Sequence, residues 1–212
     1  MMLKTLFFSM LLHLGWMDKQ APWMQQVNPR ELTQTARRTA QAQPGFPGAL
    51  WKQAAEKHGV DPVMLYSVAL FESGKQGGRN KTGPWPFALH FNEAGVSIYP
   101  SSIKEARFVL AHVTTDNVDI GLGQVNFKSH KDKVQRAEDL LDPKINLTVA
   151  SQILAEAITS TPDLELGVGR YHSWKEWRAR AYGRKVLTIY KTLKEFLDKQ
   201  ETALARRQPY HG

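Results

Sequence analysis

The 212-residue chain is 42% hydrophobic and 10% aromatic, so it can bury a sizeable core and is not an intrinsically disordered protein. It has no cysteine, which excludes disulfides, cysteine-ligated zinc and a cysteine nucleophile. The formal net charge of +8 favours an anionic partner such as nucleic acid, a membrane surface or an acidic cell wall.

The N-terminal segment has the pattern of an export signal. After Lys4, a mostly apolar run from Leu6 to Trp16 is about ten residues long, whereas a membrane span needs about 20. A small-residue cleavage pattern is poor at residues 19–21 and better at residues 40–42. We therefore interpret residues 1–43 as a signal, cleaved or retained as an anchor, followed by a polar linker. A buried N-terminal helix is the alternative.

The helical part of the chain begins after a proline- and glycine-rich break at residues 44–48, so we place one domain at residues 44–200. The apolar spacing of residues 50–55 predicts a helix that ends near Gly59. Asp61 followed by proline predicts a second helix, because a carboxylate caps the first turn and proline fits the first helical position. That helix ends at Phe71-Glu72-Ser73-Gly74, where the helix dipole disfavours a carboxylate.

Later elements follow in chain order. The alternation at residues 87–91, the turn at 92–95 and the return at 96–99 predict a small β-hairpin. A capping box at residues 102–105 opens a helix to about His112. Asp142-Pro143 opens another helix, and the apolar spacing from Val186 to Leu197 predicts a long C-terminal helix before a flexible tail at residues 201–212. The expected fold is mainly α with one small inserted β-hairpin.

Four polar segments interrupt this helical pattern, at residues 69–74, 117–126, 142–147 and 167–173. In this order and spacing they resemble the soluble lytic transglycosylases, a branch of the lysozyme-like superfamily, over roughly Leu50 to Leu193. The resemblance implies a peptidoglycan lytic transglycosylase that cleaves the β-1,4 bond between N-acetylmuramic acid and N-acetylglucosamine and leaves 1,6-anhydromuramic ends.

Glu72 is the expected catalytic residue. A glycosidic leaving group must be protonated as the bond breaks, so the pKa of its acid has to rise from about 4.3 toward 6 or more. Burial beside Phe71 and the negative end of the helix both act in that direction. The resemblance implies that this single glutamate serves first as acid and then as base, while the substrate's own acetamido group stabilises the intermediate.

The resemblance also implies four substrate-binding residues. Ser73 belongs to the Glu-Ser pair, and Gln124 matches the glutamine that points its amide at the sugar acetamido group. Asn146 matches a helix-start asparagine that either orders the cleft or contacts substrate. Tyr171 matches the tyrosine that lies over the glutamate.

Three positions leave alternatives open. Gly123 replaces the methionine that is commonest in the family, which either loosens a glycan subsite or repacks the core. His172 replaces an asparagine, and we interpret it as a cleft-lining or satisfied residue. Asp119 is read as structural or substrate-orienting; if it faced Glu72, ordinary hydrolysis would become more credible.

The segment from Trp85 to Pro100 looks like an insertion found in enzymes that accompany conjugation, type IV secretion or pilus machinery. The expected partners are peptidoglycan glycan strands and such machinery, in the periplasm or cell envelope, with membrane contact only through the N-terminal segment. No cofactor, metal or nucleic acid is expected, because the histidines lack metal-ligand spacing and no nucleic-acid-binding motif occurs. The alternatives are a hydrolytic muramidase and a non-catalytic wall-binding assembly protein.

Overall fold

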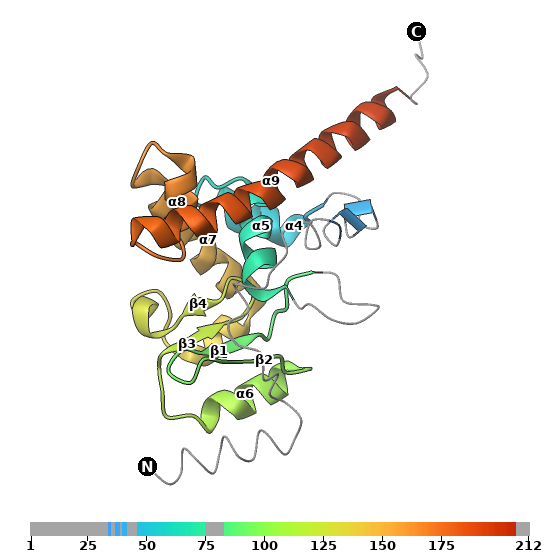
Figure 1. Cartoon of the computed structure of the whole chain (residues 1–212). Coiled ribbons are helices and arrows are strands. Elements are labelled where there is room, and N and C mark those ends of the chain that lie inside the picture. The colour runs from blue at the N-terminus through green and yellow to red at the C-terminus, as the bar shows by residue number, and fades with distance from the viewer. Residues whose placement is uncertain (1–33, 35–36, 39, 42–45, 75–82, 207–212) are drawn as a thin grey trace.

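The computed structural model describes residues 34, 37–38, 40–41, 46–74 and 83–206. It is mainly helical, as the sequence predicts, and it has two regions (Figure 1). One contains five helices, and the other contains a small sheet and one helix. The predicted export signal lies outside the described residues. Ala40 is buried, so packed residues occur before the predicted domain start at residue 44.

The central helix is α5 (Pro62–Ser73), preceded by α4 (Ala49–Glu56) and a turn in which Gly59 has a φ of 69°. Both helices begin and end close to the predicted positions. Asp61 caps α5 by accepting hydrogen bonds from the backbone N–H groups of Val63 and Met64. Every residue from Val63 to Ser73 is buried, so α5 is surrounded by protein on all sides.

The predicted hairpin is present but belongs to a larger sheet. Strands β1 (Leu89–Phe91) and β2 (Val96–Ile98) pair antiparallel, and β3 (Val118–Ile120) and β4 (Val125–Asn126) extend the sheet in the order β2-β1-β3-β4. The prediction of a lone hairpin was therefore incomplete. The antiparallel pairing of β1 with β3 sets His90 opposite Asp119.

Two more helices begin where their caps predict. Helix α6 (Ile103–Ala111) follows Ser102, whose hydroxyl accepts from the N–H of Glu105, while the Glu105 carboxylate reaches back to Ser101. Helix α7 (Pro143–Thr159) follows the Asp142 cap. Two short 3₁₀ helices, η1 (Lys128–His130) and η2 (Ala137–Leu141), connect β4 to α7.

Helices α8 (Leu164–Arg170) and α9 (Glu176–Ala205) pack so closely that a Cβ at Gly169 would lie 1.9 Å from the Ala179 carbonyl oxygen. Helix α9 begins ten residues earlier than its apolar stripe and extends well beyond the helical region (Figure 1). Helix α9 continues through residues 201–205, which belong to the predicted flexible tail. Within the described ranges, no helix combines the length and hydrophobicity that crossing a membrane requires.

Candidate active site

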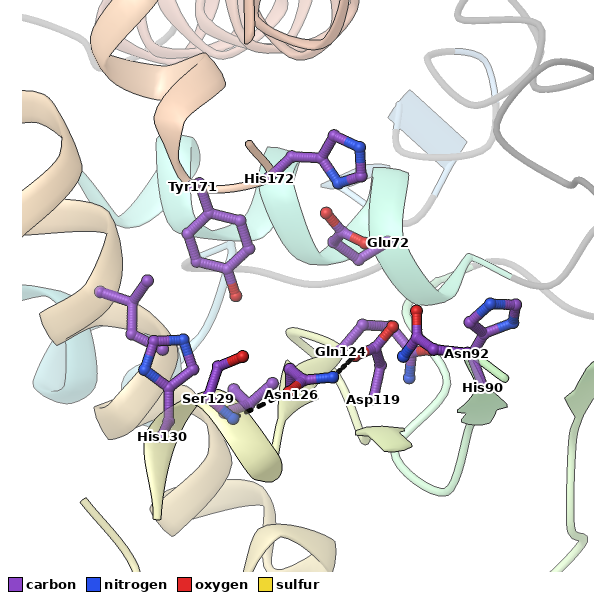
Figure 2. A pocket seen from close by; sticks show the side chains of 12 residues that line it. Glu72, His90, Asn92, Asp119, Gln124, Asn126, Ser129, His130, Tyr171 and His172 are labelled. Carbon is purple, nitrogen blue, oxygen red and sulfur yellow. Dashed lines mark hydrogen bonds between the residues drawn. The ribbon is translucent and has the colours of Figure 1, made fainter. Parts of the chain in front are cut away.

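Glu72 lies on the last turn of α5 at a cleft of about 280 Å³ between the helices and the sheet (Figure 2). Its side chain is only 6% exposed, and its Oε1 accepts a hydrogen bond of 2.6 Å from the Tyr182 hydroxyl. The cleft is largely polar. Its lining residues are Glu72, His90, Asn92, Asp119, Gln124, Val125, Asn126, Ser129, His130, Ile153, Tyr171 and His172.

The electrostatic environment keeps Glu72 protonated at neutral pH. Burial is the largest influence and raises the pKa of Glu72 to about 8, because a charged carboxylate loses its solvation there. The negative charge of Asp119 acts in the same direction, whereas the hydrogen bond from Tyr182 lowers the pKa by favouring the carboxylate form. A protonated carboxyl group can donate a proton to a substrate. The sequence pattern predicted the burial that raises the pKa of Glu72.

Tyr182 holds the Glu72 carboxyl group from α9. It is buried, its ring packs edge-to-face on Phe71 at 5.1 Å, and the His172 ring stacks on it at 5.1 Å with an interplanar angle of 13°. Tyr182 was not among the site residues predicted from the sequence. A signal was available, because Tyr182 lies four residues before Val186 on the buried face of the C-terminal helix, where a tyrosine hydroxyl needs a partner.

Gln124 and Tyr171 both reach the cleft. Gln124 has a positive φ of 47°, and its Nε2 donates to the carbonyl oxygens of Ala88 (3.0 Å) and Gly121 (2.9 Å). Its amide oxygen accepts no hydrogen bond from the described residues and can accept one from a ligand. The Tyr171 hydroxyl donates to the Gly123 carbonyl oxygen at 2.7 Å, so the phenol borders the same turn.

Asn146 supports this turn from behind. It is 1% exposed, its Oδ1 accepts from the N–H of Gly123 at 2.8 Å, and its Nδ2 donates to the carbonyl oxygens of Ile120 and Leu140. It is not a lining residue of the cleft. Of the two roles left open by the sequence, this geometry favours ordering the cleft.

Gly123 lies in the same turn and leaves no extra space. A Cβ there would lie 2.6 Å from the Cβ of Ala150 and 2.9 Å from the Tyr171 hydroxyl. Neighbouring side chains therefore fill the space that a larger side chain at this position would occupy. Of the two alternatives for the departure from methionine, the structure supports a repacked core.

Ser73 is also 1% exposed and is not a lining residue of the cleft. Its hydroxyl is shared between the carbonyl oxygens of Leu122 (2.7 Å) and Ala69 (3.0 Å), and it accepts from the N–H of Trp85 at 3.1 Å. These contacts join the end of α5 to the turn after β3. The structure thus places Ser73 where it can position Glu72 and the turn relative to each other.

Asp119 lies in the cleft with Glu72, on β3 across from α5 (Figure 2). Its Oδ1 accepts from Asn126 Nδ2 at 2.7 Å. Burial raises the pKa of Asp119, while hydrogen bonds from Asn126 and Asn92 lower it. The sequence showed no pattern that turned Asp119 toward Glu72, because the pairing with β1 that does so is long-range.

His172 lines the mouth of the cleft, in agreement with its interpretation as a cleft-lining residue. Sequence reasoning did not single out the residues of the sheet-side wall, among them His90, Asn92 and His130. Across the described ranges, no group of three or more His, Asp or Glu side chains is arranged to hold a metal ion.

A family model described as "Transglycosylase SLT domain" matches residues 49–185, more than half of the chain, and this range includes the whole cleft. Comparisons with curated proteins and with solved structures give no match.

Proposed function

Because the chain belongs to the transglycosylase SLT domain family, it is a peptidoglycan lytic transglycosylase acting at the cell envelope, and we propose that Glu72 is its single catalytic acid and base. The observation that carries this proposal is the buried Glu72 carboxyl group. It lies at a polar cleft, its pKa is raised to about 8, and a tyrosine holds one of its oxygens.

The reaction has two proton transfers. Protonated Glu72 donates its proton to the glycosidic oxygen while the bond to the muramic acid anomeric carbon breaks and the electron pair leaves with the N-acetylglucosamine oxygen. The Glu72 carboxylate then removes the proton of the muramic acid 6-hydroxyl, whose oxygen bonds to the anomeric carbon. No water is consumed, Glu72 ends protonated, and the product carries a 1,6-anhydro ring. Because nucleophile and electrophile share one sugar, this closure is intramolecular.

Tyr182 is the positioning residue for Glu72. Its hydrogen bond favours the carboxylate that forms after the first transfer, so it counteracts part of the effect of burial. Within the described part of the chain, only Oε1 of Glu72 has a hydrogen-bond partner, which leaves Oε2 for the substrate. The carboxyl group can therefore alternate between its two forms at near-neutral pH.

The remaining predicted site residues have two kinds of role in this proposal. Gln124 and Tyr171 border the cleft and contact the sugar, with the Gln124 amide oxygen accepting from the acetamido N–H. Ser73 and Asn146 act on binding indirectly, since both are buried and hold the turn that carries Gln124.

The test is digestion of purified sacculi with the wild-type enzyme and with Glu72→Gln, followed by mass analysis of the released muropeptides. Wild type should release anhydro-ended fragments, and the variant should release almost none, since removing a general acid costs about 10²–10⁴ in rate. Equal lysis by both proteins would overturn the assignment of Glu72. No lysis by a folded wild-type protein would support the wall-binding alternative.

A hydrolytic branch is the second candidate, and the position of Asp119 in the cleft favours it. Two-carboxylate glycosidases use the second carboxylate as nucleophile or as base for water. In such a branch Asp119 would direct water to the anomeric carbon, and a reducing muramic acid end would form. The measurement is the ratio of reducing to anhydro ends, which Asp119→Asn should lower if the branch operates.

We further propose that the enzyme opens the wall locally for an envelope-spanning transfer apparatus, after export through its N-terminal segment. The proposal is supported by the resemblance that the segment from Trp85 to Pro100 bears to an insertion found in enzymes that accompany such machinery. Its ends are joined by a hydrogen bond of 2.9 Å from Trp85 Nε1 to the Pro100 carbonyl oxygen, and its strands β1 and β2 pair with each other. A strain that lacks the gene should lose transfer or secretion, and wild type but not Glu72→Gln should restore it. Unchanged transfer in that strain would contradict the role.

A further inference from the structure

Two tryptophans that follow the cleft residue His172 along the chain are largely exposed. Trp174 is 70% exposed in the connection between α8 and α9, and Trp177 is 69% exposed in the first turn of α9. Each carries an arginine over its ring at 5.1 Å, Arg170 on Trp174 and Arg178 on Trp177. We refer to these four residues as the tryptophan ledge. Large exposed aromatic rings are unfavourable in water and mark interaction surfaces.

Three of the four ledge residues closely follow the cleft residues Tyr171 and His172 along the chain, and Arg170 directly precedes them. Tyr171 and His172 line the cleft, and only Ser173 separates His172 from Trp174. Burial lowers the pKa of His172, and the positive charge of Arg178 lowers it further, to a smaller extent. Arg178 is therefore near enough to the cleft mouth to act on a group there.

The arginines of this part of α9 differ in their partners. Arg180 pairs with Asp163 at 2.8 Å and with Glu176 at 2.9 Å, and Arg184 pairs with Glu165 at 3.2 Å. Arg178 is exposed and forms no ion pair with any described carboxylate, and its guanidinium carbon lies over the Trp177 ring, 5.1 Å from the ring centre. A stacked guanidinium keeps its N–H edge available, and that edge binds a carboxylate through two parallel hydrogen bonds.

The substrate supplies such a carboxylate. Muramic acid in peptidoglycan bears a short peptide, which combines small apolar side chains with free carboxylates and leaves the glycan at the sugar next to the cleaved bond. We propose that the tryptophan ledge binds this peptide stem, with Arg178 taking one carboxylate and the exposed indoles packing on the peptide. The proposal rests on the proposed cleavage of peptidoglycan and assigns the part of the substrate outside the cleft.

The experiment compares two soluble substrates: glycan strands that retain their peptides and the same strands after an amidase has removed them. Wild type should cleave the peptide-bearing strands with the higher kcat/KM. In Arg178→Ala the ratio of the two kcat/KM values should fall roughly threefold to tenfold, as expected for an exposed charge-assisted pair. Trp177→Ala should lower the same ratio, because it removes the surface that orders Arg178.

Arg107→Ala is the matched control. Arg107 is exposed on α6, forms no ion pair among the described residues, and is not a lining residue of the cleft. Its loss removes the same charge and should leave the ratio at the wild-type value. An unchanged ratio in Arg178→Ala, or a wild type that cleaves both substrates equally well, would overturn the proposal that the tryptophan ledge binds the peptide. The proposed cleavage of peptidoglycan would still stand. If wild type cleaved neither substrate, the proposed function would fail first.

Discussion

The hydrogen bond from Tyr182 to Glu72 gives the sharpest test of how the site sets its acid. Tyr182→Phe removes a 2.6 Å contact that favours the carboxylate form, while the ring that packs on Phe71 and His172 is retained. A hydrogen bond to a charged group contributes about 1.5–3 kcal/mol, and one pKa unit corresponds to about 1.4 kcal/mol. We therefore expect the pKa of Glu72 to rise by about one to two units, from about 8 in wild type.

The sign of the kinetic effect follows from the first step. The enzyme acts when Glu72 is protonated, so activity falls as pH rises through its pKa. In Tyr182→Phe this alkaline limb should move upward by about one to two pH units, and kcat at the optimum should drop, because the carboxylate formed after proton transfer is less stable. The assay is the pH dependence of cleavage of soluble glycan strands.

Tyr190→Phe is the control for this variant. Tyr190 lies on the same helix, and its hydroxyl donates to Asp61 at 3.0 Å, away from Glu72. It should leave the alkaline limb in place, and thermal unfolding should show that both variants are folded. If the alkaline limb of the pH–activity profile stays fixed or moves downward in Tyr182→Phe, the hydrogen bond from Tyr182 does not lower the pKa of Glu72, and the reasoning is refuted.

Three further outcomes follow from the site. Because folding raises the pKa of Glu72 from 4.5 to about 8, the ionisation of Glu72 opposes folding above about pH 5. Glu72→Gln should therefore raise the free energy of unfolding at pH 7 by at most about 3 kcal/mol and leave it unchanged near pH 4, as measured by urea unfolding. Asp119→Asn removes a charge that raises the Glu72 pKa, so its alkaline limb should move downward, opposite to Tyr182→Phe; an upward shift would contradict this. Asn146→Ala leaves the buried N–H of Gly123 unpaired and should lower the free energy of unfolding by about 1–3 kcal/mol, as measured by urea unfolding; an unchanged unfolding midpoint would contradict this.

Local sequence signals were enough to predict the helices that position Glu72. The Asp61-Pro62 cap and the continuous apolar run after it fix where α5 begins, and the glycine after Ser73 marks its end. Capping depends on residues within three or four positions of each other, so it can be recognised without tertiary information. Glu72 could therefore be placed on the last turn of a buried helix.

The rest of the site depends on long-range contacts that no local pattern contains. Strands β3 and β4 are too short to show alternation, and the pairing of β3 with β1 turns Asp119 toward the cleft. Tyr182 meets Glu72 across 110 positions of the chain. Asn146 could be recognised as a member of the polar pattern, but whether it faced substrate or protein depended on the packing of α7 against the turn.

The central claim, that Glu72 drives ring closure within the substrate rather than attack by water, is tested most directly by digestion of sacculi in water enriched in oxygen-18. The account predicts anhydro-ended muropeptides without solvent oxygen at the new end, and almost no product with Glu72→Gln. Solvent oxygen in most of the new muramic acid ends, or wild-type turnover by Glu72→Gln, would contradict it.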